Sequence, residues 1–146
     1  MKKEDIVMPD DGKVIIAKED CSGIFRLAVY GSPGEALQAI VSDGVDFGDL
    51  TSGGDGCYSG GSLTQLHILP VREGEAAVNG RVCSFTDLSR IDGFCQNWPD
   101  ESGTCRRVSA YIVYKKGSEF PFATFADHKN IEDLIDAIRD GRSISI

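Results

Sequence analysis

Five cysteines and two histidines are the residues of this chain that could bind a transition metal or attack a substrate. They are Cys21, Cys57, Cys83, Cys95 and Cys105, with His67 and His128. Structural zinc sites usually take their ligands in close pairs on tight turns, and no C-x-x-C pair occurs here. A set such as Cys83, Cys95, Cys105 and His67 lacks that spacing. The sequence therefore predicts no metal site and no other cofactor.

One cysteine stands in a motif that could carry nucleophilic chemistry. The tetrapeptide Asp20-Cys21-Ser22-Gly23 resembles the Asp-Cys-Ser-Gly signature of the papain-like cell-wall peptidases, and Phe47-Gly48-Asp49-Leu50 resembles a Gly-Asp-Leu stretch of the same family. This resemblance over eight residues implies a cysteine peptidase or amidase with Cys21 as nucleophile and His67 as base. The same tetrapeptide is also typical of a turn between two strands. We favour the turn, and whether the chain is an enzyme stays open, with a protein that is not an enzyme as the preferred alternative.

A glycine-rich segment could hold phosphate or calcium. Gly56 and Gly61 have the G-x-x-x-x-G spacing, but Ser62 stands where a phosphate-binding P-loop needs lysine. The neighbouring aspartates do not have the alternating spacing of an EF-hand. We therefore predict that residues 45–62 form a long, acidic loop without regular structure, which is often functional or mobile in a compact domain.

The charge of the chain excludes one class of partner and favours another. There are 23 acidic residues against 15 lysines and arginines, which gives a net charge of −8, and residues 1–100 carry all of it. A nucleic-acid-binding protein would need a basic surface. An acidic surface instead attracts a basic protein by electrostatic steering.

The main functional hypothesis is therefore a small acidic protein-binding module. The type that fits best is an inhibitor or immunity protein that neutralises a basic toxin or nuclease. The candidate contacts are acidic or aromatic residues, namely Asp43, Asp46, Asp49, Asp55, Tyr58 and Trp98. A small-molecule-binding domain is a further alternative, and the oligomeric state is left open.

The N-terminal residues predict a cytoplasmic protein without a membrane segment. Lys2 and Lys3 are followed at once by Glu4 and Asp5, and no apolar signal region comes after them. The cytoplasm keeps thiols reduced, so we expect free cysteines. A disulfide between Cys95 and Cys105, which bracket a polar segment, is the alternative.

Periodicity and turn residues predict the secondary structure. We expect a hairpin of residues 13–19 and 24–30, a helix capped by Ser32 that ends near Gly44, strands at 66–71 and 81–85, a helix at 85–94 and a loop at 96–104. Strands at 108–114 and 120–125, a helix from Asn130 to Gly141 and an edge strand at 143–146 complete the set.

Two of these segments carry the clearest patterns. Ile131, Leu134, Ile135 and Ile138 follow the helical period, and they predict one buried helix face. In the strand at 108–114 apolar residues occur on both faces, so we expect both faces to be covered.

The fold class that follows is α+β. We predict a mostly antiparallel sheet of about five or six strands with two or three helices packed on one face. No linker or repeat divides the chain, so residues 1–146 are expected to form a single domain.

Overall fold

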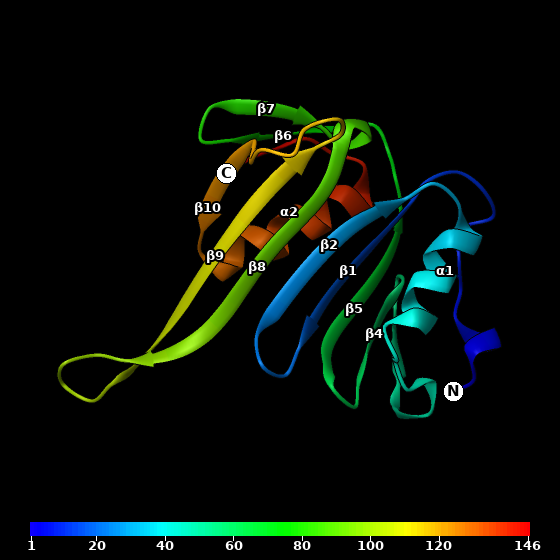
Figure 1. Cartoon of the computed structure of the whole chain (residues 1–146), viewed down its shortest axis with the longest axis horizontal. Coiled ribbons are helices and arrows are strands. Elements are labelled where there is room, and N and C mark those ends of the chain that lie inside the picture. The colour runs from blue at the N-terminus through cyan, green and yellow to red at the C-terminus, as the bar shows by residue number, and fades with distance from the viewer.

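The computed structural model describes all of residues 1–146, and its elements are drawn in Figure 1. The strands are β1 (Val14–Asp20), β2 (Ile24–Tyr30), β3 (Thr51–Gly54), β4 (Cys57–Gly60), β5 (Leu63–Pro70), β6 (Glu75–Val78), β7 (Arg81–Ser84), β8 (Leu88–Pro99), β9 (Cys105–Lys115), β10 (Ala123–Ala126) and β11 (Ile144–Ser145). The helices are α1 (Pro33–Ser42) and α2 (His128–Asp140), with short 3₁₀ turns at Lys3–Asp5, Phe47–Asp49 and Phe85–Asp87.

The strands form one large and one small sheet. Eight strands follow the order β10-β9-β8-β2-β1-β5-β4-β3, and each neighbouring pair is antiparallel. A second sheet has the order β11-β6-β7, in which β11 runs parallel to β6. The prediction of a mostly antiparallel α+β fold is confirmed, but the sheet is larger than the five or six strands expected.

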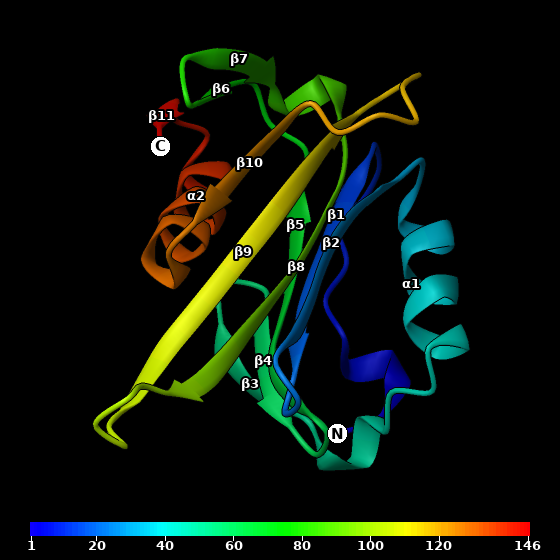
Figure 2. The same cartoon turned by 60° about the vertical axis from the view of Figure 1, so that its left-hand side comes forward.

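The two helices lie on opposite faces of the large sheet, which corrects the prediction that they share one face. Ile15 and Ala17 of β1 belong to the core that contains the apolar residues of α2. Val14 and Ile16 belong to the core that contains Ile40 of α1. Because side chains alternate along a strand, these two cores lie on the two sides of β1, as Figures 1 and 2 show.

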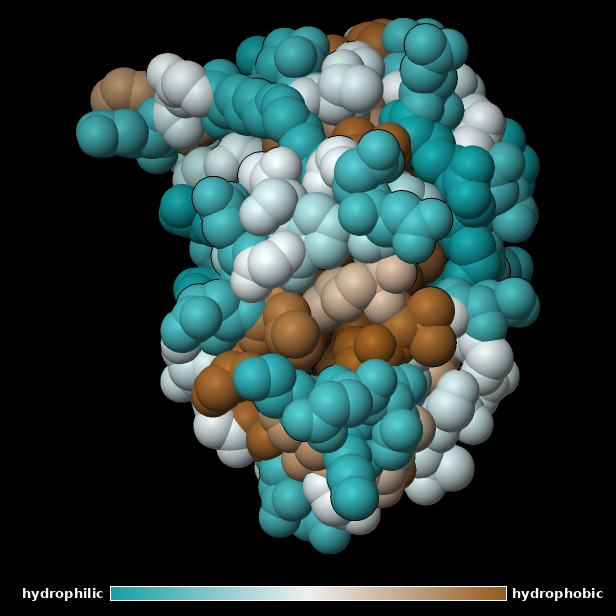
Figure 3. Space-filling model, turned by 90° about the vertical axis from the view of Figure 1, so that its right-hand side faces the viewer, coloured by the Kyte–Doolittle hydropathy of each residue, from teal (hydrophilic) through white to brown (hydrophobic).

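The core under α1 is continuous with apolar side chains at the surface. Figure 3, which views the side that carries α1 and the N-terminus, shows apolar side chains gathered in a hollow between polar rims. The partly buried apolar residues packed against this core are Met1, Met8, Tyr30, Val45 and Phe47. The second core, under α2, is larger and contains the fully buried Tyr111 and Phe25.

Capping residues explain where both helices begin and where α2 ends. The Ser32 side chain accepts a hydrogen bond from the Glu35 backbone N–H at 3.2 Å, as a helix cap does. The α2 helix is capped by Asp127 rather than by Asn130, and ends at Gly141 in the left-handed conformation. Its four predicted apolar residues are all buried.

The segment 45–62 is not the loop that we predicted. It contains a 3₁₀ turn and the hairpin of β3 and β4 at the edge of the large sheet. Gly54 and Gly56 have positive φ in the turn of this hairpin, and Gly60 has positive φ at a register shift. The glycines therefore serve turns and bulges between short strands, whereas we had interpreted them as a sign of irregular structure.

The helix predicted at 85–94 is also wrong. A 3₁₀ turn at Phe85–Asp87 is followed by β8, which extends through Pro99 and so includes part of the predicted loop 96–104. A bulge between Leu88 and Arg90 shifts the register. It places Leu88 and Ile91 in one core although they are three residues apart, a spacing that imitates a helix.

Strands β8 and β9 continue beyond the rest of the sheet as a long two-stranded arm (Figure 1). None of the helices is long and apolar enough to span a membrane.

Candidate functional site

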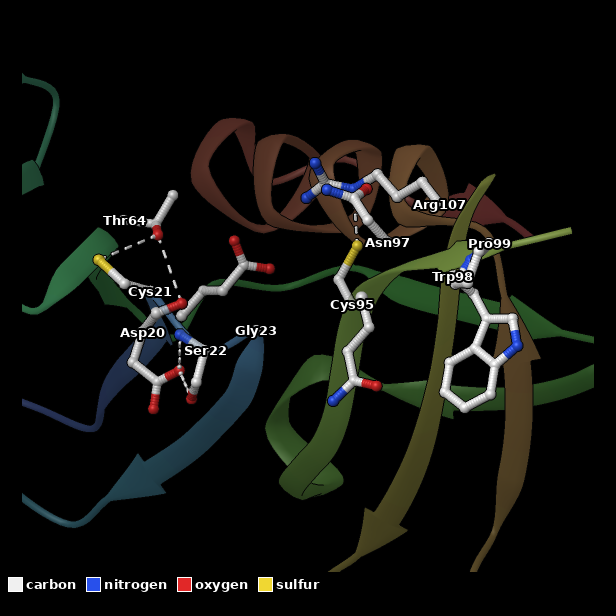
Figure 4. A pocket seen from close by; sticks show the side chains of 12 residues that line it. Asp20, Cys21, Ser22, Gly23, Thr64, Cys95, Asn97, Trp98, Pro99 and Arg107 are labelled. Carbon is white, nitrogen blue, oxygen red and sulfur yellow. Dashed lines mark hydrogen bonds between the residues drawn. The ribbon is translucent and has the colours of Figure 1, made fainter. Parts of the chain in front are cut away.

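A hollow of about 720 Å³ lies between the β1–β2 turn and the base of this arm. Cys21 and Thr64 line one side, and Cys95, Asn97 and Arg107 line the other. In Figure 4 the side chains of Cys95, Asn97 and Arg107 point to one side of their strands, whereas Trp98 points away from them.

A polar cluster with a buried centre extends from the hollow towards α2, and we call it the Glu19 cluster. It consists of Glu19, Cys95, Arg107, Tyr111 and His128, which come from β1, β8, β9 and α2. Glu19 is only 3% exposed and Cys95 only 7%. Arg107 Nε donates to Cys95 Sγ at 2.7 Å.

His128 connects the cluster to helix α2. Its Nδ1 lies 3.0 Å from the Tyr111 hydroxyl oxygen and 3.8 Å from Glu19 Oε1. Its Nε2 lies 3.0 Å from Glu132 Oε1, one helical turn further along α2. A neutral imidazole that donates from Nε2 to Glu132 therefore keeps the lone pair of Nδ1 free to accept.

The electrostatics of the cluster favour a charged guanidinium and a protonated phenol. The bond to Cys95 raises the pKa of Arg107 above its usual value. Burial, and then the neighbouring Cys95 and Glu19, raise the pKa of Tyr111 far above that of a free tyrosine. Glu19 Oε1 is buried and has no hydrogen-bond partner, a state that costs free energy unless a ligand or cation pairs with it.

The structure does not bring Cys21 and His67 together. Cys21 lies exposed in the β1–β2 turn, and its Sγ is 3.7 Å from the Gly61 carbonyl oxygen. His67 pairs with Ala17, four residues before Cys21, which corresponds to about 13 Å along a strand. The arrangement gives Cys21 no imidazole base, and the peptidase hypothesis gains no support from it.

Both ring nitrogens of His67 already have partners inside the protein. Nε2 lies 2.7 Å from Gln65 Oε1, and Nδ1 accepts from Arg139 Nη2 at 2.9 Å. Burial, and then the charge of Arg139, lower the pKa of His67 to about 4. His67 is therefore neutral at physiological pH.

Because His67 is neutral in the folded protein, we expect the protein to lose stability in mild acid. Between its unfolded pKa of about 6.5 and its folded pKa of about 4, the unfolded chain binds a proton that the folded chain does not. The free energy of unfolding should therefore fall as the pH decreases through this window, by about 2–3 kcal/mol at pH 4.5. Urea unfolding at pH 7 and pH 4.5 measures the change. The variant His67→Gln should lose correspondingly less between the two pH values, and equal losses in both proteins would contradict the assignment.

The predicted partner-binding residues do not form one surface. Asp43, Asp46 and Asp49 lie within one seven-residue stretch after α1, where Asp43 pairs with Lys18 and the Asp46 carboxylate accepts from Gly48 N at 3.0 Å. Asp55 lies instead in the β3–β4 turn, where its carbonyl accepts from Arg139 Nε.

The two predicted aromatic contacts differ from each other. Tyr58 is only 3% exposed, and its hydroxyl accepts from the Val7 N–H, so it belongs to the core under α1 and cannot contact a partner there. Trp98 is 62% exposed on the β8–β9 arm, away from the aspartates.

All five cysteines are free thiols. The register of the arm places Cys95 opposite Ser109 and Cys105 opposite Pro99, so the alternative of a disulfide between them is not realised. Cys83 lies in the small sheet and Cys105 on the exposed arm, so the four residues considered for zinc do not gather.

Sequence reasoning missed Glu19, Arg107 and His128 as members of one site. One signal was available for Glu19. In β1 it continues the inward positions of Ile15 and Ala17, so alternation places a carboxylate on the core face of the strand. Nothing in the sequence joins that position to His128, because the contact depends on where α2 crosses the sheet.

Comparisons with known proteins were negative: no family model, no curated protein and no solved structure matches this chain. Its function is therefore argued from geometry.

Proposed function

We propose that this chain is a protein-binding module whose partner covers the part of the large sheet that α1 leaves bare on its own side. We call this the open face, and it consists of Ile24, Phe94, Trp98, Val108 and Ile112. The register of β2, β8 and β9 supports one common side, because Ile24 lies opposite Phe94 and Phe94 lies opposite Ala110. Each member of the open face is between 36% and 62% exposed.

The observation that carries the proposal is the two-sided pattern of β9. Apolar residues on both faces of this strand predict burial on both sides. Tyr111 and Val113 are buried under α2, whereas Val108 and Ile112 on the other side remain exposed. In Figure 1 this side of β8 and β9 faces the viewer, and α2 lies behind it. Exposed apolar side chains that gather on one side of a sheet often mark interaction sites.

Charged groups lie among and beside the residues of the open face, and they define the chemistry of the partner. Arg26 and Arg90 each donate from Nε to the Asp92 carboxylate at 2.9 Å. Beside them a hollow of about 570 Å³ extends to Asp43, at the start of the acidic stretch after α1. A partner with an apolar centre and a basic flank would complement both parts.

The net charge of −8 supports a basic partner, and we propose that the chain acts as an inhibitor or immunity protein for a basic toxin or nuclease. The five free thiols are consistent with the cytoplasm as its location.

The variant Ile112→Asp tests this proposal. A charge in the centre of the open face should weaken partner binding by about 30-fold or more, the effect of losing an interface hot spot. Val82→Asp is the matched control, because Val82 is 51% exposed on the small sheet. The partner is first identified by stoichiometric capture from the native host with the wild-type chain as bait. Titration calorimetry with the purified partner then compares the affinities of the two variants. Equal affinities for the two variants would exclude the open face as the contact surface.

A further inference from the structure

We propose that Glu19, Cys95 and His128 form a binding site for a divalent transition metal, and that zinc fits it best. One oxygen, one sulfur and one nitrogen donor from these residues all lie within 4.8 Å of one another. Zinc binds such donors at about 2.0–2.3 Å, so the donors of a tetrahedral site are about 3.3–3.8 Å apart. An oxygen and a nitrogen donor of such a site are about 3.3–3.5 Å apart, so the 3.8 Å between Glu19 Oε1 and His128 Nδ1 must shorten by a few tenths of an ångström when the metal binds.

The unpartnered oxygen of Glu19 is an independent indication of a ligand. Oε1 is the only buried side-chain nitrogen or oxygen atom of the chain without a hydrogen-bond partner. Buried carboxylates are normally paired or coordinate a metal. A cation between Glu19, Cys95 and His128 would supply the missing partner and offset the cost of burying this charge.

The surroundings of His128 match those of a metal-bound histidine. A ligating histidine usually donates its other ring N–H to a carboxylate, which fixes the tautomer and orients the ring. The Nε2 of His128 lies 3.0 Å from Glu132 Oε1. Nδ1 lies 3.8 Å from Glu19 Oε1, and its lone pair accepts from the Tyr111 hydroxyl, a bond that a metal at Nδ1 would replace. Glu132 is therefore a positioning residue for the proposed ligand.

Cys95 offers a sulfur donor whose position is held by a neighbour. Arg107 Nε donates to Cys95 Sγ at 2.7 Å, and this bond keeps the sulfur beside Glu19 and His128. The mixed sulfur, nitrogen and oxygen set suits zinc or cobalt, whereas calcium and magnesium prefer oxygen ligands alone.

Three protein ligands leave a fourth coordination position. Glu19 and Cys95 line the hollow of Figure 4, and His128 lines a second hollow of about 400 Å³ on the side of α2. Water or a small donor ligand can therefore reach the site, as in zinc sites with an open position. The site is on the α2 side of the sheet, opposite the open face, so its test is independent of the proposed function.

Cobalt titration tests the site directly. Chain treated with a chelator and a reductant should bind one equivalent of Co²⁺ and develop a thiolate-to-cobalt charge-transfer band. Cys95→Ser should abolish the band. Cys21→Ser should retain it, because Cys21 is an exposed thiol at the rim of the same hollow. Failure of the wild-type chain to develop the band at millimolar Co²⁺, or an unchanged band in Cys95→Ser, would overturn the proposal.

A second variant is needed because Cys95→Ser would also lose the band if it did not fold. The Glu132 side chain is 56% exposed, so Glu132→Gln should leave the metal-free protein as stable as wild type in a thermal melt. It should nevertheless weaken zinc binding 10- to 100-fold, the usual effect of removing such a partner. An unchanged zinc affinity in this variant, measured by competition with a chromophoric chelator, would contradict the role of His128 as a ligand.

Discussion

Replacing Tyr111 by alanine is expected to lower the free energy of unfolding by about 3–5 kcal/mol, the usual cost of removing a large aromatic ring from a core. Tyr111 is fully buried in the core under α2. Its ring packs edge-on against Phe25, with the centroids 5.5 Å apart, and stacks on Phe125 at 5.0 Å. It also rests on Gly93, where any side chain would overlap the ring. The cavity left by alanine would therefore open between β2, β8, β9 and β10.

The control for this prediction is Tyr111→Phe. Phenylalanine keeps the ring contacts and loses only the hydroxyl that lies 3.0 Å from His128 Nδ1, so a loss of about 1 kcal/mol is expected. Urea unfolding monitored by circular dichroism measures both variants. If Tyr111→Phe and Tyr111→Ala lose similar amounts of unfolding free energy, the contribution of Tyr111 comes from its hydroxyl and not from the packing of its ring.

Replacing Gly23 by alanine is expected to cost about 3 kcal/mol or more. Gly23 has φ near +89°, and an added Cβ would overlap the carbonyl oxygen of Cys95. The backbone conformation costs a non-glycine residue about 1–2 kcal/mol, and the overlap adds about 1–3 kcal/mol. The Cys95 N–H, which donates to the Gly23 carbonyl at 2.8 Å, would also be displaced.

Gly12→Ala separates these two costs. Gly12 has a similar φ near +79°, but nothing lies within 4 Å of its added Cβ. Alanine there should cost only the conformational part, about 1–2 kcal/mol. If the two variants unfold at the same urea concentration, the close approach of β2 to β8 at Gly23 is not a constraint on the fold.

The parts of the fold that depend only on residues close together in the sequence were predictable. The apolar spacing of α2 and the Ser32 cap of α1 need only a local pattern, and both predictions are confirmed. The start of β8 was not predictable, because a bulge at Leu88 replaced the alternation of a strand by a three-residue spacing. Whether a helix covers one or both faces of the sheet is likewise a long-range property, which no local pattern contains.

The candidate sites illustrate the same limit. Glu19, Cys95 and His128 are far apart in the sequence, and they meet because β1 and β8 each lie beside β2 while α2 crosses the sheet above them. The aspartates after α1 were correctly located on the surface, but Tyr58 was not, since the Val7 N–H and the core under α1 hold it inside.

The most direct measurement of the central proposal is site-specific photo-crosslinking from the open face. A benzophenone amino acid is placed at Ile112, and at Val82 as the control position on the small sheet. The proposal predicts a crosslink between Ile112 and one basic partner, detected by mass spectrometry, and none from Val82. Efficient crosslinking from Val82 with none from Ile112, or crosslinks from Ile112 only to a second copy of this chain, would contradict it.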